Sequence, residues 1–145
     1  MENKVSVELI NTTNIEAKKM LDIVENFLVD IKNNKFQKLC LDFTSKLDVV
    51  VDECKILIKT YNTELKENNF FDKYQSIISL KLASLTKKST TDFAEIFFIS
   101  TSQALPQLYS QLIYQDLDEI ALVKKLIKIF EEFLVNLKQF FLCVE

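Results

Sequence analysis

The chain has 145 residues, of which 48% are hydrophobic and 27% charged, and its formal net charge is −3. This composition is typical of a folded domain with a real core and excludes a disordered tail. Glycine, histidine and arginine are absent, and Pro106 is the only proline. The lack of glycine disfavours β-hairpins and excludes P-loops and dinucleotide-binding loops, and the lack of histidine excludes Ser-His-Asp and Cys-His catalysis.

These features predict an all-α fold, in which residues 1–145 form a single domain of four or five helices packed mostly antiparallel. The N-terminal residues 1–13 are expected to be extended, an early helical turn or weakly ordered, because Val5, Val7 and Leu9 alternate with polar residues and no second strand is evident. Thr13 and Glu16 have the spacing of a capping box, so the first helix is expected to begin there.

A long second helix is predicted from Lys35 to Lys66, after a short turn at Asn33-Asn34 that makes the two helices antiparallel. Apolar residues recur along it at alternating spacings of four and three, which is the stripe of a helix that packs on one side. The stripe consists of Phe36, Cys40, Phe43, Leu47, Val50, Cys54, Leu57 and Tyr61. Leu47, Val50 and Leu57 are predicted to be core residues.

A third helix is expected between Phe71 and Leu85, and a fourth is expected to begin at Asp92. Residues 96–115 carry no charge, but they include eight serine, threonine and glutamine residues, which are too costly in a bilayer. We therefore expect a buried helix and no transmembrane segment. Pro106 is expected to kink this helix or to start a new one, because proline lacks an amide hydrogen.

The last helix is expected to be capped by Asp116 and Asp118, and its core-facing residues are predicted to include Ile127, Phe130 and Leu134. Its apolar residues cover close to half of its circumference, which is more than a helix on the rim of a simple bundle needs. The helix is therefore either central or in contact with a second protein. We predict a partner-binding surface that also includes two residues of the second helix facing away from its stripe. The surface consists of Leu122, Ile129, Phe133, Phe140, Val49 and Ile56.

The cysteines and carboxylates do not form a recognisable catalytic or metal-binding pattern. Cys40 and Cys54 are fourteen residues apart on one helix, about 21 Å, so neither a disulfide nor a shared metal can join them. Both are interpreted as core residues, and Cys143 as an exposed thiol. The acidic residues are interpreted as solvated helix faces, namely Asp22, Glu25, Asp42, Asp48 and Asp52.

The sequence therefore predicts a non-catalytic protein-interaction protein without cofactor or metal: a self-associating protein, an assembly subunit or an inhibitor of a partner. One alternative is a carrier of an apolar ligand such as a lipid, suggested by twelve phenylalanines and a kink at Pro106. Another is a small acidic antagonist or immunity-type protein. No concentrated basic patch is present for nucleic acid. The odd number of cysteines and the lack of a secretory signal favour the cytoplasm.

Overall fold

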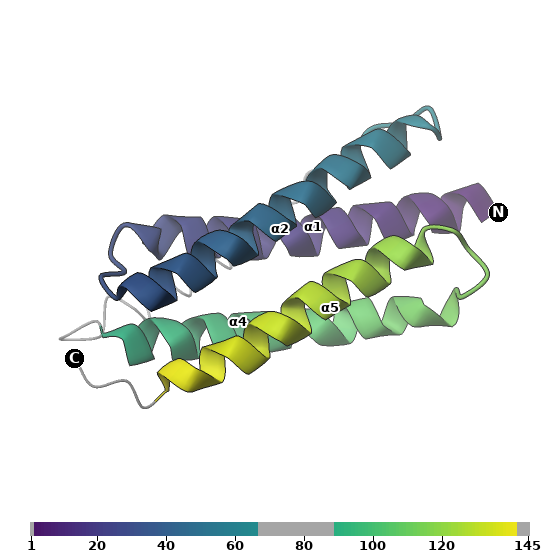
Figure 1. Cartoon of the computed structure of the whole chain (residues 1–145). Coiled ribbons are helices and arrows are strands. Elements are labelled where there is room, and N and C mark those ends of the chain that lie inside the picture. Colours follow the sequence, from purple (N-terminus) through teal and green to yellow (C-terminus); the bar gives the residue numbers. More distant parts are fainter. Residues whose placement is uncertain (1, 67–88, 142–145) are drawn as a thin grey trace.

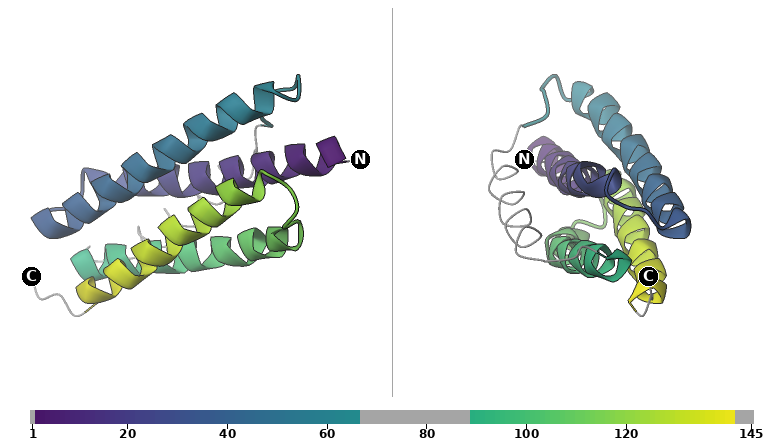
Figure 2. Two further views of the ribbon diagram at one scale, coloured as in Figure 1. Left: turned by 45° about the vertical axis from the view of Figure 1, so that its right-hand side comes forward. Right: turned by 90° about the vertical axis from the view of Figure 1, so that its left-hand side faces the viewer.

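The computed structural model describes residues 2–66 and 89–141, and within these ranges the chain forms an all-α bundle without a strand. Its helices are α1 (Glu2–Leu28), α2 (Asn34–Lys59), α4 (Thr90–Ser110) and α5 (Ile120–Leu137), with short 3₁₀ turns η1 (Gln111–Ile113) and η2 (Lys138–Phe140). Figures 1 and 2 show α2 and α5 as one layer and α1 and α4 as the other, with neighbouring helices antiparallel. The third helix predicted from Phe71 to Leu85 and the thiol of Cys143 lie outside the described residues.

The helix α1 begins at Glu2, so the expectation of an extended or weakly ordered N-terminal segment is wrong for residues 2–13, and the helical alternative is the one observed. Buried positions recur at helical spacing through this segment and beyond it, including Leu9, Ile10 and Ala17. Packing along that stripe outweighs the local preference of Val5 and Val7 for a strand. Thr13 does not cap a helix either, since its hydroxyl donates a hydrogen bond to the Leu9 carbonyl oxygen one turn earlier, at 2.8 Å.

The antiparallel pair of α1 and α2 confirms the predicted turn at Asn33. The Asn33 side chain accepts a hydrogen bond from the Phe36 amide at 3.0 Å and so caps the start of α2. The helix ends at Lys59, before the predicted Lys66, and Asn62 follows with a φ of 56°, a conformation that asparagine tolerates better than most residues. The predicted stripe is buried from Phe36 to Cys54, and Leu57 is half-buried.

The capping residue of α4 is Ser89, whereas the sequence analysis predicted Asp92. Asp92 occupies the third helical position, and its carboxylate accepts from the Ser89 amide at 2.9 Å while the Ser89 hydroxyl accepts from the Asp92 amide at 3.2 Å. The helix continues without interruption through Pro106 to Ser110, so the predicted restart at Pro106 is wrong (Figure 1). Leu105 and Leu108 are buried on either side of the exposed proline and anchor this part of the helix.

The start of α5 also differs from the prediction, because neither Asp116 nor Asp118 caps it. Glu119 occupies the capping position without a side-chain capping bond. Its buried carboxylate instead accepts hydrogen bonds from the hydroxyls of Ser6, at 3.0 Å, and Tyr61. This carboxylate therefore joins the beginnings of α1 and α5 to the end of α2.

The core is rich in phenylalanine, and α5 packs against α1, α2 and α4. Phe133 of α5 stacks on Phe43 of α2, with ring centroids 3.7 Å apart and planes 7° from parallel. Phe36 meets Phe140 edge-on at 4.9 Å and stacks on Phe97 of α4 at 6.0 Å. Such ring pairs stabilise a core beyond the area that they bury.

Candidate protein-interaction surface

The structure separates the six residues that the sequence assigns to a partner-binding surface. Four of them are buried inside the bundle and are at most 8% exposed, namely Leu122, Ile129, Phe133 and Phe140. The expectation that they form an exposed flank of α5 is therefore wrong for the folded chain. They are buried because α1, α2 and α4 of the same chain pack against α5.

The remaining two, Val49 and Ile56, are exposed on α2. They are 49% and 68% exposed, and Leu41 on the same helix is 47% exposed. At about 100° per residue, the three side chains fall within about 80° of arc on the side of α2 opposite its buried stripe. We call these three residues the outer face of α2. Aliphatic side chains aligned in this way are a candidate contact surface, whereas single exposed ones are ordinary.

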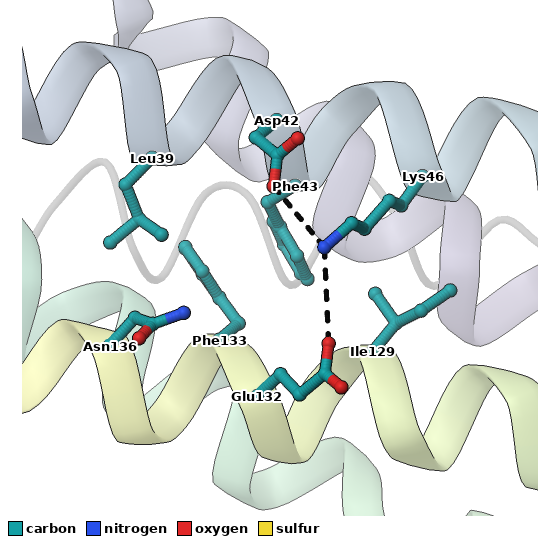
Figure 3. A pocket seen from close by; sticks show the side chains of 8 residues that line it. All are labelled: Leu39, Asp42, Phe43, Lys46, Ile129, Glu132, Phe133 and Asn136. Carbon is teal, nitrogen blue, oxygen red and sulfur yellow. Dashed lines mark ion pairs between the residues drawn. The ribbon is translucent and has the colours of Figure 1, made fainter.

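One flank of the outer face is closed by contacts between α2 and α5. Lys46 pairs with Asp42 at 3.2 Å and with Glu132 of α5 at 3.8 Å, and Lys125 of α5 pairs with Glu53. Figure 3 shows the first of these networks beside the stacked rings of Phe43 and Phe133. The hollow beneath it has a volume of about 10 Å³, which holds at most about one water molecule. This seam therefore offers no room for a ligand.

The opposite flank carries three acidic side chains: Asp22 and Glu25 of α1 and Asp48 of α2. We call them the acidic trio, and all three are exposed. Partial burial raises the pKa of the Glu25 carboxyl above its ordinary value, and the nearby carboxylates of Asp48 and Asp22 raise this pKa further. The carboxylates of Asp22 and Asp48 are therefore close enough to repel that of Glu25, and Asp48 does so across the seam between the two helices.

This repulsion predicts that Glu25→Gln stabilises the protein at neutral pH. A carboxyl whose pKa is raised on folding costs stability once it is ionised, so the cost is absent well below pH 4.5 and appears as the pH rises through the folded-state pKa. Because the site is exposed and screened, we expect a gain of only about 0.2–0.5 kcal/mol at pH 7. Urea unfolding at pH 7 and pH 3 measures it.

Glu8→Gln, an exposed position on the same helix, is the matched control for this prediction. It removes an equal charge without touching the acidic trio. A Glu25→Gln protein that gained no stability at pH 7 relative to this control, or that kept the same gain at pH 3, would contradict the electrostatic origin of the effect.

A second surface feature is an apolar groove at the end of the bundle where α1 begins. It has a volume of about 450 Å³ and lies between the first turn of α1 and the loop after η1. Its lining includes Val5, Ile113, Tyr114 and Leu117, and Ile113 is 76% exposed. Lys4 and Asp116 bring opposite charges to the same groove, so its charge favours neither an anionic nor a cationic ligand.

Reactive groups do not gather at either surface. Burial raises the pKa of the Cys40 and Cys54 thiols to about 12, so both are protonated and poor nucleophiles at neutral pH. The buried Glu119 carboxylate is engaged by Ser6 and Tyr61. Residues 2–66 and 89–141 contain no group of three or more histidine, cysteine or acidic side chains that could hold a metal ion.

Comparison with protein-family models, with curated proteins and with solved structures returned no match. None of the helices in the described ranges is both long enough and apolar enough to cross a membrane.

Proposed function

We propose that this chain is a non-catalytic interaction protein that binds a protein partner through the outer face of α2. The observation that supports the proposal is the alignment of Leu41, Val49 and Ile56, each close to half exposed or more, along the side of α2 that the bundle leaves uncovered. Covering a large aliphatic side chain is worth roughly 1.5–3 kcal/mol, so a partner helix laid along this face gains affinity from three contacts at helical spacing.

The proposed setting is the cytoplasm, and the role is that of an assembly subunit, a self-associating protein or an inhibitor. Cys40 and Cys54 are free thiols inside the core, as expected for a protein that works in a reducing compartment. The ion pairs Lys46–Glu132 and Lys125–Glu53 lie on the α5 flank and leave the outer face open.

Site-specific photo-crosslinking in the source cells tests this proposal. A photo-reactive phenylalanine analogue at position 49 is expected to give a discrete crosslinked species that weakens when Ile56→Ser is added. The matched control carries the same analogue at Val135, which is 65% exposed on α5. No crosslinked species from position 49, or the same species from both positions, would count against the outer face as a contact surface.

A second candidate function is the binding of an apolar ligand, favoured by the 450 Å³ groove and by the exposure of Ile113. Its volume lies within the range of about 300–1,000 Å³ that is usual for small-molecule sites. Native mass spectrometry of gently purified protein tests this function. A co-purifying lipid that is lost in Ile113→Asp supports it, and a ligand-free protein that cannot be loaded rules it out.

A further inference from the structure

The charges around the outer face of α2 are unevenly distributed. The acidic trio flanks it on the α1 side, and Asp52 lies within its arc. Lys38 and Lys59 share that arc but stand near the two ends of the helix. Lys55 approaches Asp52 at 4.0 Å, and both side chains are more than half exposed. Such an exposed ion pair contributes little to the stability of the fold. On the α1 side, Lys18 stands one turn before Asp22, so the acidic excess beside the apolar residues is confined to the region of Glu25 and Asp48.

The acidic trio also costs stability in the free protein. Partial burial, and then the nearby carboxylates of Asp48 and Asp22, raise the pKa of the Glu25 carboxyl above its ordinary value. A cationic group placed over the seam between α1 and α2 would reverse this cost by pairing with the carboxylates. An uncharged or acidic partner would leave the repulsion in place or increase it.

A second copy of the chain does not suit the middle of this surface. A twofold dimer brings the same patch of each subunit together. If such a dimer is centred on Val49, it places Asp48 and the rest of the acidic trio near their own symmetry mates. Like charges brought together at an interface disfavour association by several kcal/mol. The partner is therefore expected to be a different protein.

From these observations we infer that the outer face of α2 and the acidic trio together receive a basic amphipathic helix of another protein. This inference rests on the proposed function. The aliphatic residues of the partner helix lie on Leu41, Val49 and Ile56, and its lysine or arginine residues lie over Asp22, Glu25 and Asp48. Apolar contact supplies affinity, while the charges set the partner's identity and its rate of association.

Fluorescence anisotropy with two synthetic helical peptides tests the inference on the full chain. One peptide carries leucines on one face and lysines on both flanks of that face, and the other carries glutamates in place of the lysines. We expect the lysine peptide to bind at least about tenfold more tightly than the glutamate peptide at low salt. Its affinity should fall when the ionic strength is raised to about 0.5 M, because salt screens exposed charges.

Two double variants separate the apolar part of the surface from the acidic part. Val49→Ser with Ile56→Ser should weaken binding of the lysine peptide at least about tenfold. Glu25→Gln with Asp48→Asn should weaken it about fivefold and reduce its salt dependence. The control, Asp116→Asn with Asp118→Asn, removes the same number of charges from exposed positions in the loop before α5 and should leave the affinity within about twofold.

The outcomes distinguish failure of the inference from failure of the proposed function. Equal binding of the two peptides, or equal losses in the acidic-trio variant and the Asp116/Asp118 control, would overturn the inference. A dimer detected by light scattering that dissociates in the double variant Val49→Ser with Ile56→Ser would also overturn the inference. Such a dimer would still support the outer face as an interface. If the apolar variant changed neither peptide binding nor the crosslink from position 49, the proposed function itself would fail.

Discussion

Replacing both Phe133 and Phe140 with serine is expected to abolish the folded bundle. Phe133 is 2% exposed and stacks on Phe43, and Phe140 is 6% exposed and packs against Phe36. Truncating one buried phenylalanine costs about 3–5 kcal/mol, and a buried serine hydroxyl without a partner adds to that cost. The two losses together are comparable to the whole stability of a small domain, about 5–15 kcal/mol.

Circular dichroism during heating measures this effect, with Val135→Ser as the matched control on α5. Val135 is 65% exposed, so its replacement should change the stability by no more than about 0.5 kcal/mol. We expect the phenylalanine variant to lose its cooperative transition or to fail to accumulate in expression. If it kept a cooperative transition close to that of the control, Phe133 and Phe140 would not be part of the core.

Leu47→Ala is expected to destabilise the protein by about 2–5 kcal/mol, because the lost methyl groups leave a cavity in a packed core. Leu47 is completely buried at the middle of α2. Leu57 provides the matched control, since the same substitution lies ten residues further along the same stripe at a half-buried position. We expect Leu57→Ala to cost clearly less than Leu47→Ala in urea unfolding at pH 7. Equal losses, or a larger loss at Leu57, would mean that the assigned register of α2 is wrong.

The long stripe of α2 could be predicted from the sequence because seven apolar residues recur at helical spacing, from Phe36 to Leu57. The predicted core residues Ile127 and Phe130 are confirmed as buried, and Leu134 is half-buried. Short patterns were less informative. Val5, Val7 and Leu9 also fit a strand, and only their packing within the bundle makes them helical.

The interaction surface could be predicted only in part. Val49 and Ile56 were found because they point away from a clear stripe on their own helix, and both are exposed. The width of the apolar arc on α5 was misleading, because a single sequence does not show how many neighbours a helix has. The acidic trio depends on the register between α1 and α2, which brings Asp48 beside Glu25. The position of Asp48 along α2 and that of Glu25 along α1 do not reveal that the two residues are neighbours.

The most direct test of the outer face as a binding surface is to map where a basic amphipathic helix contacts the chain. Backbone amide NMR spectra of the isotope-labelled full chain, recorded as the lysine peptide is added, provide this map. We expect the largest shifts around Leu41, Val49 and Ile56 and in the acidic trio, with little change at Val135. Shifts centred on the groove at Ile113 and Tyr114, or spread evenly over all acidic residues, would contradict the proposed surface.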